Sequence, residues 1–205
     1  MKNLLLFIIF LNFIPFRLFG RATIEDFKKN VVSIEAIYEK ESEKGFGIVS
    51  AIQDSLYIIT AYHTLNKKEE DATIIKINLY SDIKRYNARI VHKWERQDIA
   101  VLKCLKPEWY EFNTNCLAAS TDYNENIGFI GEHGRFVVPK TLGVIESETI
   151  DDLELRISGI NYGSSGAPVF NMDGFIVIIQ ATVGNRVIVK KLNEIKNLMG
   201  RRNIP

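Results

Sequence analysis

The chain has 205 residues, of which 46% are hydrophobic and 25% are charged, with a formal net charge of +1 at pH 7. This length suits one domain with a substantial core, and the composition is that of a globular protein rather than a disordered chain. A near-neutral charge without a basic stripe excludes the electrostatic footprint of a nucleic-acid-binding protein.

The amino terminus has the form of a secretory signal. Lys2 precedes an apolar run over residues 4–16, and small residues follow at Gly20 and Ala22. The run is shorter than the roughly 20 residues that a membrane-spanning helix needs, so we expect residues 1–22 to direct export and then to be removed. The mature protein would be secreted or periplasmic, with no stable membrane insertion. An uncleaved membrane anchor is the alternative.

The rest of the chain is predicted to be all-β, with a short helix at each end. Thr23 suits the N-cap of a helix over residues 23–30. Short apolar or alternating runs follow, and their spacing is typical of a β-sandwich or barrel. The predicted strands cover residues 31–38, 45–52, 56–60, 73–80, 86–92, 99–105, 127–130, 136–138, 141–146, 153–157, 169–170, 175–181 and 186–189.

Two further segments have clear local signals. Residues 67–71 change charge sign within the run and are expected to be a solvated loop. Apolar residues at helical spacing predict a helix over residues 191–199, with Gly200 just beyond it as the C-cap.

The chain contains two cysteines, Cys104 and Cys116. In an exported protein a disulfide between them could persist and would stabilise the fold by about 2–4 kcal/mol. Two free thiols are the alternative, because the sequence gives no distance between the two residues. Their spacing resembles no zinc site, and we expect neither a metal nor a cofactor.

A turn rich in glycine and serine, Gly163-Ser164-Ser165-Gly166-Ala167-Pro168, carries the main chemical signal. Glycine lets the main chain approach a reacting group and aim its N–H groups there. A serine in such a turn suits a nucleophile, although clusters of this composition most often mark ordinary loops. A hydroxyl also needs an adjacent base, and the base needs a third group to hold it.

The sequence offers one candidate for each of these two roles. His63 stands at the end of an apolar strand, whereas His92 and His133 lack such a setting and are expected to be structural or exposed. Asp98 opens the apolar run of residues 99–102, where a partly desolvated carboxylate needs a donor such as an imidazole N–H. Taken singly, each of these residues is more often structural than catalytic.

Together the three contexts resemble the trypsin-like serine peptidases of the chymotrypsin fold, especially the bacterial HtrA/DegP type. Thr60-Ala61-Tyr62-His63 is similar to that family's T-[AN]-x-H motif, Asp98-Ile99-Ala100-Val101-Leu102 to D-I-A-[LV]-L, and the serine turn to G-[DN]-S-G-G-P. The order His, Asp, Ser is also the family's order. The PDZ domain that usually follows an HtrA protease domain is not found after residue 200.

The resemblance implies a double six-stranded β-barrel for residues 23–205, with the active site in the cleft between the barrels. The two halves would span roughly residues 31–115 and 116–190, followed by the helix over residues 191–199. The implied function is that of an exported serine endopeptidase acting on protein or peptide substrates.

The family's functional residues can be carried over position by position. The resemblance implies Ser165 as nucleophile, His63 as general base and then acid, and Asp98 as the residue that orients His63. The backbone N–H groups of Gly163 and Ser165 would form the oxyanion hole.

The resemblance also implies where the residue before the scissile bond would bind. In this family the segment before the serine and the strand after it line that pocket; here the candidates are Gly159, Ile160, Asn161, Gln180, Ala181 and Thr182. Neither segment contains an acidic residue, and burying a substrate Lys or Arg without a counter-charge would be costly. The implied preference is for an apolar side chain of small to medium size.

Two residues depart from the family's serine motif. Ser164 replaces an Asp or Asn, so activation by pairing with a newly cut amino terminus is not expected. Ala167 replaces a glycine, and its methyl group would cost about 1 kcal/mol if the backbone there had a positive φ. These departures leave a second interpretation open, a non-catalytic peptide-binding pseudoprotease on the same fold.

Overall fold

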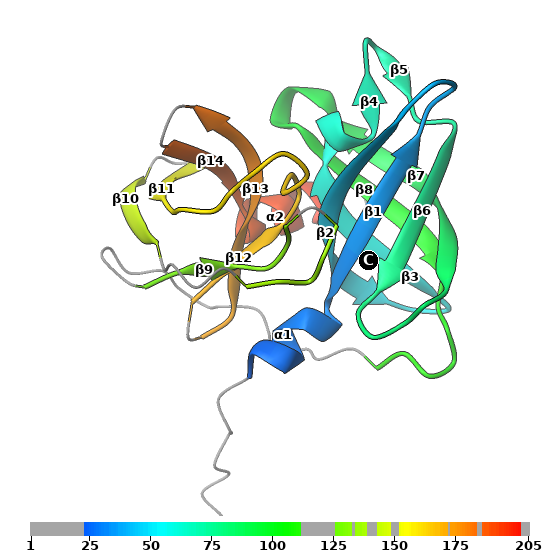
Figure 1. Cartoon of the computed structure of the whole chain (residues 1–205), viewed down its shortest axis with the longest axis horizontal. Helices are drawn as coiled ribbons and strands as arrows, with labels where there is room; N and C mark the ends of the chain where they lie inside the picture. Colours follow the sequence, from blue (N-terminus) through cyan, green and yellow to red (C-terminus); the bar gives the residue numbers. More distant parts are fainter. Residues whose placement is uncertain are drawn as a thin grey trace, which may run out of the picture.

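Two β-sheets lie side by side, with helix α1 at one end and helix α2 behind them (Figure 1). This computed structural model describes residues 23–111, 126–132, 134–138, 143–148, 152–171, 173–183 and 186–201. The first sheet is a closed six-stranded barrel and the second is a curled sheet of six strands. The predicted all-β fold with two barrel halves and two small helices is therefore confirmed.

The first barrel is antiparallel, with the strand order β1-β2-β3-β8-β7-β6, and it closes because β1 also pairs with β6. Apolar side chains of these strands point inward in alternation, as in β1, and β-bulges in β2 and β7 bend the strands around the core. The strands are β1 (Val31–Ile37), β2 (Ser42–Ile52), β3 (Ser55–Ala61), β6 (Ile74–Leu79), β7 (Arg85–Trp94) and β8 (Ile99–Leu105).

The second sheet has the order β10-β11-β14-β13-β12-β9. The residues just before its two edge strands, Ile127 and Gly143, form an antiparallel bridge with N–O distances of 3.0 and 2.8 Å. The sheet therefore curls back on itself. Its strands are β9 (Gly128–Phe129), β10 (Val144–Glu148), β11 (Asp152–Arg156), β12 (Pro168–Phe170), β13 (Phe175–Val183) and β14 (Arg186–Lys191).

Helix α1 (Ile24–Lys29) starts where the sequence places its cap. The Thr23 hydroxyl accepts a hydrogen bond from the Asp26 backbone N–H at 3.2 Å, and the Asp26 carboxylate accepts one from the Thr23 N–H at 3.0 Å. This capping box satisfies N–H groups that the helix itself leaves unpaired. Phe27 packs against Phe170 of β12, with ring centroids 5.0 Å apart, so α1 is tied to the second sheet.

Some predicted elements differ from the structure. Residues 66–71, which include the predicted loop, form a small exposed hairpin of β4 (Asn66–Lys67) and β5 (Glu70–Asp71). Residues 136–138 are not a strand, because the Val137 N–H bonds to the Arg135 carbonyl two residues back and the chain turns there.

The carboxyl-terminal helix also extends further than predicted. Helix α2 (Leu192–Gly200) includes Gly200, and Arg201 is its C-cap because the Arg201 N–H still bonds to the Asn197 carbonyl. No helix in the described residues is long and apolar enough to cross a membrane, and residues 1–22 lie outside them.

Candidate active site

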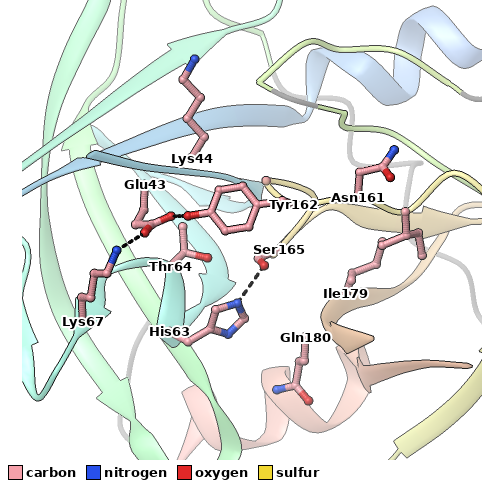
Figure 2. Close-up of a pocket in the computed structure, with 12 residues that line it drawn as sticks. Glu43, Lys44, His63, Thr64, Lys67, Asn161, Tyr162, Ser165, Ile179 and Gln180 are labelled. Carbon is pink, nitrogen blue, oxygen red and sulfur yellow. Dashed lines mark hydrogen bonds and ion pairs between the residues drawn. The ribbon is translucent and has the colours of Figure 1, made fainter. Parts of the chain in front are cut away.

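The structure brings His63, Asp98 and Ser165 together in the cleft between the two sheets. The imidazole Nδ1 of His63 lies 2.7 Å from Oδ2 of Asp98. Its Nε2 lies 2.7 Å from Oγ of Ser165, a contact that Figure 2 shows. With the proton on Nδ1 donated to the carboxylate, Nε2 is free to accept the hydroxyl proton. The geometry suits activation of a serine hydroxyl as a nucleophile.

Asp98 is held in an unusual backbone conformation. It caps the 3₁₀ turn η2 (Glu95–Gln97) with φ 53° and ψ 45°, in the left-handed region that Asp tolerates better than most residues. Its Oδ1 accepts the backbone N–H of His63 at 2.7 Å while Oδ2 faces the ring, so the carboxylate fixes both the turn and the imidazole.

Gln180 of β13 reaches across the seam between the sheets to the Asp98 turn. Its side-chain amide donates to the carbonyl of Gln97 at 2.5 Å and to that of Asp98 at 3.3 Å. The side chain is 8% exposed, so these bonds form away from most of the solvent. A residue of the predicted substrate pocket thus also holds the backbone of the carboxylate residue.

His63 itself lies in the 3₁₀ turn η1 (Tyr62–Thr64), directly after β3. The buried Tyr62 hydroxyl donates to Asp71 at 2.6 Å and accepts from Lys93 at 2.7 Å, and Lys93 also bonds Asp71 at 3.0 Å. Burial would raise the pKa of Asp71, but bonds from Tyr62, Asn66 and Lys93 hold it below its usual value.

This network attaches the histidine turn to the β4–β5 hairpin and to β7. The hydrogen bonds to Tyr62 and Asp71 also raise the pKa of Lys93, so the cation persists. The sequence did not indicate the network, because its members come from separate elements that only the closed barrel brings together.

The Ser165 turn is fixed to both sheets through its backbone. The Ser165 carbonyl accepts the Phe46 N–H of β2 at 2.8 Å, and the Gly166 N–H donates to the Ile179 carbonyl of β13 at 2.8 Å. Gly166 has φ +76°, and a Cβ there would lie 2.0 Å from the Phe46 carbonyl oxygen. Only glycine fits at this position of the turn.

The two departures from the family's serine motif have simple structural explanations. Ser164 is 1% exposed, and its hydroxyl donates to the Gly131 carbonyl at 2.9 Å, so it anchors the turn without a charge. Ala167 is buried and is not among the residues with positive φ. The strain considered for its methyl group therefore does not arise.

Two backbone N–H groups of the same turn are open to an external acceptor. Gly163 has φ +87°, which orients its peptide group in a way that other residues rarely adopt. Within the described residues, the N–H groups of Gly163 and Ser165 donate to no protein acceptor.

A cavity of about 690 Å³ surrounds the serine and is walled by both sheets. Of the predicted pocket residues, Ile160, Asn161 and Gln180 line it, together with Ile179. Gly159 is not part of its lining, and the side chains of Ala181 and Thr182 lie outside what the structure describes. The Asn161 amide donates to the carboxylate of Glu132 at 3.1 Å, a neighbour that the sequence did not suggest.

The opposite wall of the cavity is charged, which the sequence did not predict. Lys67 bonds Glu43 at 2.6 Å and Glu41 at 2.7 Å, and the Tyr162 hydroxyl donates to Glu43 across the cleft (Figure 2). The cavity therefore joins a largely uncharged side, near β13, to a charged side on β2 and β4.

Of the two alternatives for the cysteines, the structure has Cys104 as a buried free thiol, and burial raises its pKa to about 12. Cys116 lies outside the described residues. His92 packs on Trp94, with ring centroids 4.2 Å apart, and does not line the cavity around the serine; His133 is not described. No group of three His, Cys, Asp or Glu that could hold a metal occurs in the described part of the chain.

Comparisons with known proteins agree with this architecture. The chain is similar in fold to the Rv3671c protease of M. tuberculosis in its active form, with a TM-score of 0.72 and 14% identity over 88% of this chain and 83% of that one. No curated protein sequence matches it significantly. The family model of the trypsin-like peptidase domain matches residues 45–178, which include His63, Asp98 and Ser165. The chain belongs to the family of trypsin-like serine peptidases.

Proposed function

We propose that this protein is an exported serine endopeptidase that cleaves peptide bonds through an acyl-enzyme on Ser165. The observation that carries the proposal is the continuous series from Asp98 through His63 to Ser165, with both links at 2.7 Å. It supplies the base and the orienting group that a hydroxyl nucleophile requires. A protein that only binds peptides has no need of this series, so we favour hydrolysis over a peptide-binding pseudoprotease.

In the first half of the reaction, Ser165 Oγ attacks the scissile carbonyl carbon while its proton moves to Nε2 of His63. Asp98 stabilises the imidazolium that forms. The negative oxygen of the tetrahedral intermediate would accept hydrogen bonds from the N–H groups of Gly163 and Ser165, which donate to no acceptor among the described residues. Collapse of the intermediate breaks the C–N bond, and His63 gives its proton to the departing amine.

In the second half, water attacks the acyl-enzyme. His63 takes a proton from the water, and the new tetrahedral intermediate uses the same backbone donors. Its collapse releases the carboxyl product and returns the proton to Ser165. No cofactor is required for either half.

We further propose that the protein prefers substrates with an apolar residue of small to medium size immediately before the scissile bond. Ile160 and Ile179 give this side of the cavity an apolar surface, and Gln180 is uncharged. Among the described residues that line this side of the cavity there is no carboxylate that could neutralise a substrate Lys or Arg.

The proposed location is outside the cytoplasm. It rests on the sequence pattern of residues 1–22, which we assign as an export signal preceding a peptidase domain over residues 23–205. The protein would then meet protein or peptide substrates in the periplasm or in the medium.

Substitution of Ser165 by alanine tests the proposed chemistry. We expect kcat/KM on a peptide substrate to fall by about 10⁴-fold or more, with an unchanged far-ultraviolet circular dichroism spectrum, because the base then has no nucleophile to activate. His63→Ala should cause a comparable loss, whereas His92→Ala should retain activity. Full activity in Ser165→Ala would refute the mechanism, and peptide binding without any turnover by the unaltered protein would favour the pseudoprotease.

A further inference from the structure

Lys44 of β2 stands where two cavities meet. It lines the cavity around Ser165 and also a second cavity of about 300 Å³, which lies against the first barrel. Glu35, Asp82 and Arg85 are the other charged residues of this second cavity. A peptide leaving the nucleophile in this direction would therefore pass the Lys44 side chain.

Lys44 lies on the side of Ser165 that faces away from the proposed pocket for the residue before the scissile bond. Figure 2 shows it across Ser165 from Gln180, with its amino group directed away from the serine. Its strand is fixed close to the nucleophile, because the Phe46 N–H two residues later bonds the Ser165 carbonyl. If the residue before the scissile bond binds in the proposed pocket, the part of the substrate that departs as the amine would extend toward Lys44.

Lys44 is also the one unpaired charge in the walls of the two cavities, as far as the structure describes them. The other charged side chains of the two cavities, and His63, all have a partner. These pairs are Glu43 with Lys67 and Tyr162, Lys67 with Glu41, Glu35 with Arg85, Asp82 with Tyr86, and His63 with Asp98 and Ser165.

The charges that line the second cavity balance in number, but both of its carboxylates, Glu35 and Asp82, already have partners other than Lys44. In the barrel register Glu35 stands opposite Lys44 on one side and opposite Lys76 on the other. The single Glu35 carboxylate is already bonded to Arg85 at 2.6 Å. Asp82 accepts hydrogen bonds from the Tyr86 hydroxyl at 2.7 Å and from the Lys84 backbone N–H at 2.9 Å. A carboxylate brought by a ligand would therefore meet in Lys44 a cation that has no partner among the described residues, and it would be attracted there.

We propose that Lys44 is a specificity-determining residue that recognises a carboxylate on the leaving side of the substrate. The carboxylate could belong to an acidic side chain or to a free carboxyl terminus. This inference rests on the proposed endopeptidase function, because it concerns how a substrate is bound. Peptide binding can be measured without cleavage. Because Lys44 is exposed, its effect is modest, about three- to fivefold in affinity.

The test uses the full chain carrying Ser165→Ala, so that peptides bind without being cut. Three fluorescent peptides share one sequence up to an apolar residue and differ after it. One has glutamates and an amidated end, one has neutral residues and an amidated end, and one has neutral residues and a free carboxyl terminus. Fluorescence anisotropy should show tighter binding of at least one carboxylate peptide than of the neutral amidated peptide.

A matched charge reversal identifies the residue responsible. Lys44→Glu should abolish or invert the preference, whereas Lys40→Glu makes the same charge change at an exposed residue that lines neither cavity and should leave it intact. The preference should also shrink in 0.5 M NaCl, because salt screens exposed charges. Tighter binding of the glutamate peptide would show that an acidic side chain is recognised, and tighter binding of the peptide with a free carboxyl terminus would show that a terminal carboxylate is recognised.

Equal binding of all three peptides, or the same loss in Lys40→Glu as in Lys44→Glu, would overturn the inference. Hydrolysis by the active protein, measured with the same peptides, separates the two proposals. Cleavage without carboxylate preference refutes only the role of Lys44. A Lys44-dependent binding preference without any cleavage supports the role of Lys44 and refutes the endopeptidase.

Discussion

Ser164 shows how a neutral residue can anchor the turn of the nucleophile. Its hydroxyl reaches the Gly131 carbonyl at 2.9 Å and also accepts the Asn161 N–H at 3.4 Å. The bond is buried, so it joins two loops of the second sheet without a charge that would have to be compensated. The turn is therefore held in place without a newly formed amino terminus.

Removing this hydroxyl should affect both stability and rate. Ser164→Ala leaves the Gly131 carbonyl without its donor, which should lower the free energy of unfolding by about 1–3 kcal/mol. Because the turn also carries the Gly163 and Ser165 N–H groups, kcat should fall with little change in KM. Urea unfolding and steady-state kinetics measure both effects.

Ser50→Ala is the matched control for this substitution. The Ser50 hydroxyl also donates to a carbonyl, that of Tyr57 at 3.2 Å, but it lies in the first barrel away from the cavity. It should lower stability without lowering kcat. An equal loss of kcat in both variants would show that Ser164 has no particular role in the site.

At the level of elements, the site depends on two tight turns, each tied to several strands. The η1 turn carries His63 and is bonded through Tyr62 to the β4–β5 hairpin and to β7. The Ser165 turn is bonded to β2 on one side and to β13 on the other. Functional groups on turns that are held by several hydrogen bonds keep their geometry without substrate.

The glycine in the serine turn should be far less replaceable than the alanine beside it. Gly166→Ala places a Cβ 2.0 Å from the Phe46 carbonyl oxygen and 2.6 Å from the Thr60 hydroxyl, at φ +76°. We expect a loss of about 3 kcal/mol or more in unfolding free energy, together with loss of activity.

The neighbouring substitution Ala167→Gly provides the comparison. It requires no new contact, and it should cost only about 1 kcal/mol through backbone entropy and the lost methyl group. Urea unfolding of both variants measures the difference. Similar stabilities of Gly166→Ala and Ala167→Gly would contradict the described packing of the turn.

At the level of the molecule, one apolar cluster spans both sheets. Phe46, Ile48 and Val101 of the first barrel belong to the same buried cluster as Phe129 and Val169 of the second sheet. Helix α1 adds Phe27 to this cluster, packed on Phe170 and Phe175. The seam that carries the site is thus part of the core, and we expect the two halves to unfold together.

Truncation of Phe27 tests this shared core. The side chain is 3% exposed, and Phe27→Ala should lower the free energy of unfolding by about 3–5 kcal/mol while the urea transition stays single. Ile24→Ala, on the 46% exposed face of the same helix, should change stability little. Two separate unfolding transitions in the unaltered protein or in Phe27→Ala, seen by circular dichroism and tryptophan fluorescence, would contradict a common core.

The sequence could predict the strands and the approximate location of the site, because both depend on local patterns. Alternating apolar residues indicated most strands, and the contexts of His63, Asp98 and Ser165 indicated the residues that the structure brings together. The bond from Ser164 to Gly131 and the charges around Lys44 could not be predicted. They join segments far apart in the chain that meet only when each sheet curls and the two sheets pack.

The most direct test of the central claim is covalent labelling of the folded protein with a fluorophosphonate, followed by peptide mapping in a mass spectrometer. Attack by an activated serine forms a phosphonyl ester and expels fluoride, so one adduct is expected, on Ser165. His63→Ala should suppress the labelling, since the hydroxyl then loses its base. Absence of an adduct on the folded, unaltered protein, or an adduct that forms equally well without His63, would contradict the account.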